Sequence, residues 1–134
     1  MGKVVHVAVG VVLREDGKIL IARRPEHLHM GGRWEFPGGK VEAGEKVEEA
    51  LARELREEVA IEVQTLAPLT EIRHDYLEKT VLLDTWWVTE FTGEARGLEG
   101  QETAWVTAGE LNDYQFPEAN GAIIEAIELA KSRR

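Results

Sequence analysis

Residues 39–61 read GKVEAGEKVEEALARELREEVAI, and they carry the clearest structural pattern in the chain. From residue 45 to residue 59 it is rich in good helix formers, and its apolar residues recur at helical spacing, which predicts a helix. With about 100° between successive residues, the apolar side chains form one stripe roughly 120° wide that faces the core. That stripe consists of Val47, Leu51, Leu55 and Val59.

Three glutamates of this helix lie against the apolar stripe rather than opposite it. Glu54 and Glu58 fall inside or beside the stripe, and Glu57 lies at its edge. Burying one unpaired carboxylate costs several kcal/mol, and clustering three adds mutual repulsion. Arg53 and Arg56 point elsewhere on the helical wheel, so we do not expect them to neutralise all three acids. A hard divalent cation, which prefers carboxylate oxygen, is therefore the natural partner.

A solvated acidic helix face is the commonest alternative for a glutamate-rich helix. Such a face would be stabilised by ion pairs such as Glu49 with Arg53. It would place its acids opposite Leu51 and Leu55, whereas this sequence places them between those two residues. The pattern therefore favours a metal site over a solvated face.

Strands flank the predicted helix on both sides. They are predicted over residues 4–13, 18–23, 61–76, 79–91 and 105–106. Asp16-Gly17 favours a tight hairpin, so the first two strands are expected to form a meander. Glycine-containing, aperiodic stretches predict loops over residues 25–39 and 92–101.

A closing helix is predicted over residues 118–131. Its apolar stripe consists of Ile123, Ile124, Ile127 and Ala130. Strands, a helix, more strands and a terminal helix predict an α/β fold in which a mixed β-sheet is sandwiched between helices, an α/β/α sandwich. At 134 residues we expect one domain spanning residues 1–134.

Composition excludes several classes of function. The chain has no cysteine, so disulfides, zinc–thiolate sites and cysteine nucleophiles are excluded. A net charge of −9 argues against polymeric nucleic acid as a partner, but a small phosphorylated ligand can bind if divalent cations bridge it to carboxylates. No apolar run approaches the roughly 18 residues of a membrane span, and we expect no signal peptide, because residues 1–7 lack an apolar stretch and a small-residue cleavage site. We expect a cytoplasmic protein that is a monomer or a weak homodimer.

The quoted stretch also carries a recognisable motif. The pattern Gly39-x5-Glu45-x7-Arg53-Glu54-Leu55-x-Glu57-Glu58-x-Ala60-Ile61 resembles the Nudix box, which asks for glycine where Ala60 stands. In that family the box is a loop–helix–loop that holds Mg²⁺ or Mn²⁺. A left-handed backbone at Ala60 would cost roughly 1 kcal/mol for alanine, without touching a metal ligand.

The resemblance implies a role for each matching residue. The metal ligands are implied to be Glu54, Glu57, Glu58 and the backbone carbonyl of Gly38. Glu54 is implied to be the general base or the principal metal ligand, and the sequence does not separate those roles. Arg53 and Glu45 are implied to hold the helix and its carboxylates in place.

Similarity to MutT-type 8-oxo-dGTP diphosphatases extends over nearly the whole chain. The similar segments are Ala8-Val9-Gly10, Ala22-Arg23-Arg24-Pro25, Trp34-Glu35-Phe36-Pro37-Gly38-Gly39-Lys40 and Phe116-Pro117-Glu118-Ala119-Asn120. The implied substrate-binding residues are Arg24, His29, Glu35, Phe36, Pro37, Gly38 and Asn120. Phe36 is implied to line the base pocket, and Asn120 to meet the base edge, because an amide offers both a donor and an acceptor. Glu99 matches an additional metal-binding or base glutamate of this group.

The expected function is metal-dependent hydrolysis of 8-oxo-dGTP to 8-oxo-dGMP and pyrophosphate, which would remove a mutagenic nucleotide before DNA replication. Two alternatives remain open. One is a Nudix hydrolase of another diphosphate-linked substrate, such as ADP-ribose. The other is a nucleotide-sensing module that keeps the fold without turnover. Retention of Glu54, Glu57 and Glu58 argues against the second alternative.

Overall fold

The computed structural model describes residues 3–28 and 31–132. Its elements in chain order are β1 (Lys3–Val12), β2 (Ile19–Arg23), β3 (Trp34–Glu35), β4 (Gly38–Lys40), α1 (Val47–Val59), β5 (Glu62–Asp75), β6 (Lys79–Thr92), β7 (Thr103–Val106), the 3₁₀ helices η1 (Ala108–Asp113) and η2 (Glu118–Asn120), and α2 (Gly121–Ser132). The predicted helix in the quoted stretch and the two long predicted strands after it are confirmed to within two residues at each end.

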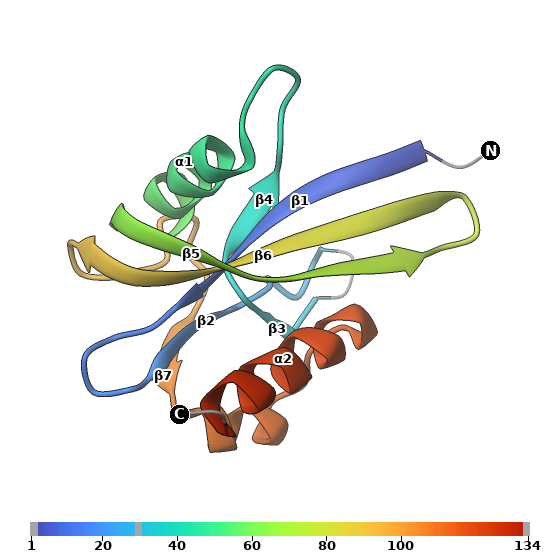
Figure 1. Ribbon diagram of the computed structural model, residues 1–134. Coiled ribbons are helices and arrows are strands. Elements are labelled where there is room, and N and C mark those ends of the chain that lie inside the picture. Colours follow the sequence, from blue (N-terminus) through green and yellow to red (C-terminus); the bar gives the residue numbers. More distant parts are fainter. Residues whose placement is uncertain (1–2, 29–30, 133–134) are drawn as a thin grey trace.

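Two sheets build the molecule. The larger has the strand order β4-β1-β6-β5 and is mixed, because β1 runs parallel to β6 whereas the other pairs are antiparallel. The smaller has the order β3-β2-β7. Figure 1 shows α1 and α2 on opposite sides of the larger sheet. The prediction of a mixed sheet between helices is therefore confirmed.

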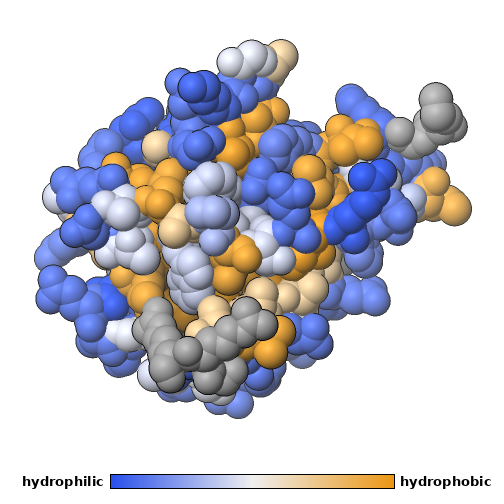
Figure 2. All heavy atoms as spheres, viewed as in Figure 1, coloured by the Kyte–Doolittle hydropathy of each residue, from blue (hydrophilic) through white to orange (hydrophobic). Residues whose placement is uncertain are grey.

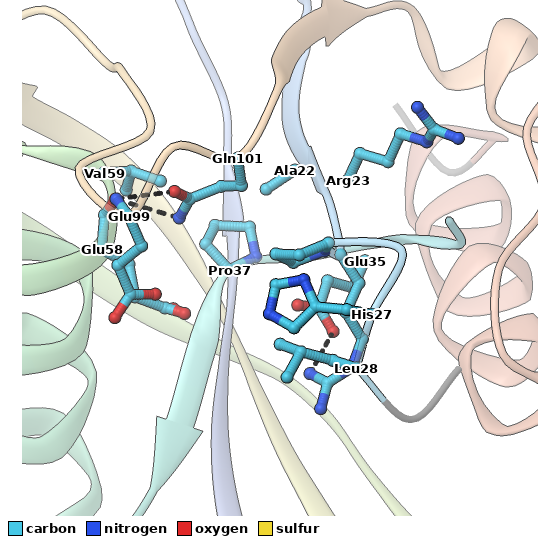
Figure 3. Close-up of a pocket in the computed structure, with 12 residues that line it drawn as sticks. Ala22, Arg23, His27, Leu28, Glu35, Pro37, Glu58, Val59, Glu99 and Gln101 are labelled. Atoms are coloured by element: carbon cyan, nitrogen blue, oxygen red, sulfur yellow. Dashed lines mark hydrogen bonds and ion pairs between the residues drawn. The ribbon is translucent and has the colours of Figure 1, made fainter. Parts of the chain in front are cut away.

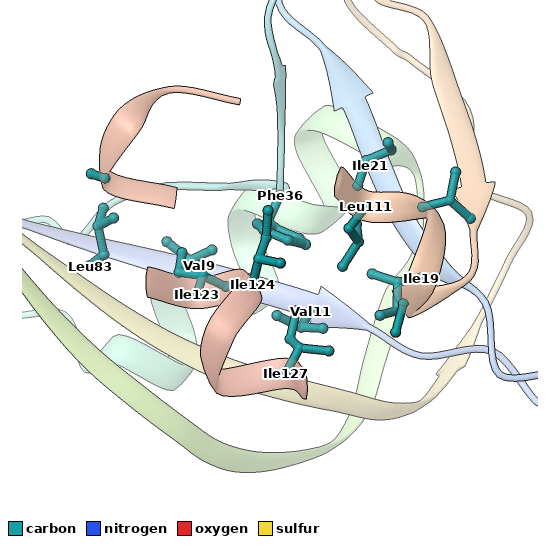
Figure 4. Close-up of a cluster of buried hydrophobic side chains, with 13 residues drawn as sticks. Val9, Val11, Ile19, Ile21, Phe36, Leu83, Leu111, Ile123, Ile124 and Ile127 are labelled. Carbon is teal, nitrogen blue, oxygen red and sulfur yellow. The ribbon is translucent and has the colours of Figure 1, made fainter. Parts of the chain in front are cut away.

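Strand β1 divides the core between the two helices, because alternate side chains point to opposite faces of a sheet. Ala8 and Val12 belong to a buried cluster with the apolar face of α1. Val9 and Val11 belong to a second cluster with Ile123, Ile124 and Ile127 of α2 (Figure 4). Among the described residues, no helix combines the length and the apolar character that crossing a membrane requires.

The start of the chain departs from the predicted meander. Backbone hydrogen bonding closes a turn between Arg14 and Lys18, but β1 and β2 then pair only through the bridge between Leu13 and Ile19. β2 leaves to pair with β7 and β3 in the smaller sheet. Asp16-Gly17 predicted the turn correctly, but it did not predict which sheet the second strand joins.

Three further boundaries differ from the sequence predictions. The segment expected to be a loop contains the short strands β3 and β4, whose residues are too few to show a strand period. The closing helix is divided into η2 and α2, and η1 was not predicted. In α2, Ile123, Ile124 and Ile127 are buried as predicted, and Ala130 is half-buried.

Candidate active site

Two glycines let β4 approach its neighbours closely. A Cβ atom at Gly38 would overlap the carbonyl oxygen of Ala8 on β1, and one at Gly39 would overlap the carboxylate of Glu54 on α1. The Gly38 N–H also points at Glu58, whose Oε2 atom is 3.4 Å away. The strand backbone and the helix carboxylates therefore share a space that side chains at residues 38 and 39 would fill.

Arg53 gathers the acids at the middle of α1 and in the preceding loop. Its Nε atom donates to Glu45 at 2.8 Å, and its Nη1 atom lies 2.9 Å from Glu54 and 3.4 Å from Glu57. The expectation that Arg53 points away from the acids was wrong, because its long side chain reaches Glu54 and Glu57. The expectation that it does not neutralise all three acids is confirmed, because among the described residues it forms no ion pair with Glu58. Hydrogen bonding from Arg53 lowers the pKa of Glu45 to about 2.

Glu57 is not crowded against the core. Its side chain is 59% exposed, compared with 20% for Glu54. The edge position of Glu57 on the helical wheel thus faces solvent. Of the three acids expected to cluster, Glu54 and Glu58 lie near the core, and Glu57 lies apart from it.

Glu58 lacks the compensation that Arg53 gives to its neighbours. Burial, followed by repulsion from Glu54 and Glu35, raises the pKa of Glu58 to about 8. Burial also raises the pKa of Glu54, against the opposing effect of Arg53. Among the described residues, Glu58 forms no ion pair with any lysine, arginine or histidine.

The glycine-containing segment between β6 and β7 covers the C-terminal end of α1. Leu98 N–H donates to the Glu58 carbonyl at 2.9 Å, and Arg96 N–H donates to the Val59 carbonyl at 3.1 Å. These bonds satisfy two of the carbonyls that every helix leaves unpaired at its C-terminus. They also bring Glu99 beside α1, where its charge contributes to the raised pKa values of Glu54 and Glu58.

A cavity of about 290 Å³ adjoins these acids (Figure 3). Figure 3 shows the Glu58 and Glu99 side chains side by side at one end, with Glu35 across the cavity. Its lining comprises Ala22, Arg23, Arg24, Pro25, His27, Leu28, Glu35, Pro37, Glu58, Val59, Glu99 and Gln101. Burial raises the pKa of Glu35, and Arg24, 3.8 Å away, opposes this effect.

A second cavity of about 660 Å³ shares only Arg24 and Glu35 with the first. Its remaining lining is the tip of the β5–β6 hairpin, Val81 and Pro117, and it includes the exposed apolar side chain of Leu77. The Arg24–Glu35 pair thus separates an acidic compartment from a more apolar one.

The predicted substrate residues divide into three groups. Arg24, Glu35 and Pro37 line the first cavity, and Gly38 lies beside it on β4. Phe36 is 5% exposed and stacks on Phe116 within the core, and Asn120 ends η2; neither lines these two cavities. His29 lies outside the described residues.

The donor set fits a hard divalent cation. Glutamate carboxylates and a backbone carbonyl are the ligands such ions prefer, and Glu58 is a half-buried acid with no ion pair among the described residues. As the side chains stand, no three acidic or histidine residues of the described ranges could together hold an ion. Like charges without a counter-ion repel, so rotation of the glutamate side chains would accompany binding.

Sequence reasoning missed two parts of the site. Gln101 was included in a loop without a role, although it lies two residues after Glu99. The apolar cavity was missed because Tyr76 and Pro117 are far apart in sequence. The one local signal for Gln101 was a polar amide side chain two residues after Glu99. No local signal indicated the second cavity.

Comparison with known proteins agrees with this geometry. Residues 8–126 match the family described as NUDIX domain. The 8-oxo-dGTP diphosphatase of Escherichia coli K12 is 37% identical over 126 residues, covering 94% of this chain and 98% of that protein. The CTP pyrophosphohydrolase of the same organism is 34% identical, covering 94% of this chain and 93% of that protein. A solved MutT structure, from a study of Aliivibrio salmonicida and Vibrio cholerae, is 41% identical with a TM-score of 0.81, covering 92% of this chain and 95% of that one.

Proposed function

The chain belongs to the Nudix hydrolase family, and from that premise we propose that it hydrolyses 8-oxo-dGTP to 8-oxo-dGMP and pyrophosphate, with Mg²⁺ as the metal and Mn²⁺ as a substitute. Nudix hydrolases typically use a divalent metal. Similarity to an 8-oxo-dGTP diphosphatase over nearly the full length of both proteins supports the choice of substrate. A cytoplasmic location is part of the same proposal.

One observation carries the proposal. Glu58 is a half-buried carboxylate that is repelled by three further carboxylates, those of Glu54, Glu35 and Glu99, and a charge in such surroundings needs a counter-charge. A metal–triphosphate complex supplies that counter-charge in the form of its cation. Holding such a group uncompensated lowers the stability of the free protein, which is typical of functional sites.

The proposed metal ligands are the side chains of Glu54, Glu57, Glu58 and Glu99 together with the Gly38 carbonyl. When bound, the metal neutralises phosphate charge and lowers the pKa of the attacking water. Glu54 would either bind the metal or accept a proton from the attacking water: burial raises its pKa, and Arg53 holds its carboxylate in one orientation. Arg53 and Glu45 position this carboxylate without touching the substrate.

Charge and polarity orient the nucleotide along the two cavities. The triphosphate occupies the acidic compartment with the metal, and the nucleoside extends past Arg24 and Glu35 toward the apolar compartment. Asn120 follows Pro117, which lines that compartment, by three residues. Oxidation at C8 turns guanine N7 from an acceptor into a donor, so an amide meeting O6 and N7–H discriminates 8-oxoguanine from guanine. Phe36, stacked on Phe116, would support the base from the core side.

The proposal is tested by turnover of 8-oxo-dGTP, dGTP, dATP, CTP and ADP-ribose under Mg²⁺. CTP is included because one relative is a CTP pyrophosphohydrolase. We expect the highest kcat/KM for 8-oxo-dGTP, and Asn120→Ala to reduce that preference. Equal rates on all five substrates would remove the sanitising function, and a preference for CTP or ADP-ribose would reassign it. Glu54→Gln should lower kcat by about 10²-fold, and an unchanged kcat would remove Glu54 from the mechanism.

A further inference from the structure

The side chain of Gln101 connects the C-terminal end of α1 to the backbone that carries Glu99. Its Nε2 atom donates to the carbonyl of Glu58 at 3.2 Å. Its Oε1 atom accepts from the N–H of Glu99 at 2.8 Å. One amide therefore joins the main chains of two residues whose side chains face the same end of the cavity (Figure 3).

This connection uses both polar atoms of the amide, each in the role that its chemistry allows. The Glu58 carbonyl already accepts from Leu98 N–H, so Gln101 supplies its second hydrogen bond. The Glu99 N–H has Gln101 as its partner. Without Gln101, the backbone at Glu99 would lose its tie to the helix, although the bonds from Leu98 and Arg96 would remain.

The segment is also packed tightly around this amide. A Cβ atom at Gly97 would overlap the carbonyl of Gln101, so the chain folds back closely before reaching Glu99. Gln101 itself is half-buried and lines the cavity, whereas Glu99 is exposed. An exposed carboxylate on an irregular segment has many available orientations, and fixing the backbone on both sides of it restricts them.

We propose that Gln101 is the positioning residue for Glu99, holding the carboxylate of that residue beside Glu58 by tying their two main chains together. The inference rests on the proposed function, because it assigns Glu99 to the metal-binding set. Gln101 would act only through Glu99, because its amide bonds to the main chain and not to the reacting atoms.

The substitution that tests this is Gln101→Met, which keeps the length of the side chain and removes both hydrogen bonds. Gln64→Met, at an exposed residue of β5 outside the site, is the matched control. In the metal-free protein, amide hydrogen exchange at Glu99 should accelerate about tenfold or more in Gln101→Met and stay unchanged in the control. Unchanged protection at Glu99 would overturn the proposal, whether or not the enzyme proves active.

Metal affinity provides the second measurement, with Mn²⁺ alone titrated by calorimetry. Gln101→Met should weaken Mn²⁺ binding by about 10-fold or more, as expected for a residue that orients a metal ligand. In a Glu99→Gln background the same substitution should change affinity by less than about twofold, because the residue it positions is already disabled. An equal loss in both backgrounds would show that Gln101 acts independently of Glu99 and would overturn the proposal.

Failure of the proposed function gives a different pattern. If the unsubstituted protein binds no Mn²⁺ and turns over no nucleotide, the function is wrong, and the exchange measurement alone decides the positioning role. If Gln101→Met does not fold, Gln101→Asn replaces it, because the shorter amide cannot span both partners at once. Full Glu99 protection in a folded Gln101→Asn protein would overturn the proposal in the same way.

Discussion

Two groups of carboxylates, on helix α1 and in the loop before it, differ in their surroundings. Around Arg53, Glu45 and Glu54 accept hydrogen bonds from a guanidinium, and the pKa of Glu45 falls to about 2. Around Glu58, one turn further along, the neighbours are other acids, and the pKa rises to about 8. Glutamates on and beside the same helix thus have pKa values shifted in opposite directions, with Glu45 lowered and Glu58 raised.

The contrast between these two groups shows that one fold can contain both a compensated and an uncompensated carboxylate. The Arg53 group fixes the helix to the loop before it through Glu45 and to β4 through the Lys40 carbonyl. The Glu58 carboxylate has only a long hydrogen bond from Gly38 N–H and, among the described residues, no ion pair, so its ionisation lowers stability. A counter-charge that arrives with the substrate complex would complete the second group, whereas Arg53 already supplies a positive charge to the first.

The largest effect is expected from Glu58→Gln, which removes the uncompensated charge but keeps the size of the side chain. We expect kcat/KM for 8-oxo-dGTP to fall by about 10²-fold or more, because a metal ligand is lost. The metal-free protein should become more stable toward urea at pH 8, because no buried carboxylate then needs to ionise. Opposite signs for activity and stability are the distinguishing result.

Glu48→Gln is the matched control for this prediction, since Glu48 is exposed in the first turn of the same helix. It should leave both activity and stability within about twofold and about 0.5 kcal/mol of the unsubstituted protein. A Glu58→Gln protein with full activity would show that the two carboxylate groups do not differ in function.

A smaller effect is expected from Arg53→Lys, which keeps the charge but removes the planar fork that contacts Glu45 and Glu54 together. We expect kcat to fall by about 10-fold, with urea stability also reduced, because Glu54 loses its orientation. Arg56→Lys, at an exposed ion pair with Glu62, should change neither quantity. Equal effects of the two lysine substitutions would contradict the special position of Arg53.

The elements around the site were predictable to the extent that their signals are local. Helix α1 and strands β5 and β6 have long periodic patterns, and their bounds were predicted closely. The pairing of β2 with β7 was not predictable, because it joins residues far apart in sequence. Strand β4 depends on the close approach that Gly38 and Gly39 allow, and β3 has only two residues, so neither strand shows a periodic pattern.

For the site, helical geometry predicted where the backbone places each acid but not where a long side chain reaches. Glu54 and Glu58 lie close to the buried face as the wheel indicated, whereas Arg53 reaches its acids by extending along the helix surface. The metal and substrate roles of these residues stay predictions. The contribution of Gln101 depends on hydrogen bonds to main chain, and a wheel or motif contains no information on those.

The pH dependence of stability provides a further test of the uncompensated charge at Glu58. The pKa of Glu58 is about 8 in the folded chain and about 4.3 in an unfolded one. Between these values the folded state holds a proton that the unfolded state releases, so metal-free stability should fall as pH rises from 5 to 8. One such proton gives a slope of at most about 1.4 kcal/mol per pH unit.

Urea midpoints measured across that range in excess chelator test this slope. The Glu58→Gln protein should lack this contribution, so its midpoints should decline less than those of the unsubstituted chain. Parallel curves for the two proteins would show that Glu58 does not hold a proton in the folded state.

The smallest effect concerns the backbone at the end of the uncompensated group. Ala60 follows α1 with φ of 63° and ψ of 29°, a left-handed conformation that glycine adopts without strain. Ala60→Gly should therefore raise the free energy of unfolding by about 1 kcal/mol, despite the greater flexibility of glycine in the unfolded chain. Ala52→Gly, inside the same helix, should lower it by a similar amount. Because neither substitution changes a charge, both proteins should keep the pH slope assigned to Glu58; a changed slope in Ala60→Gly would mean that the helix end and the acid cluster are coupled through the backbone.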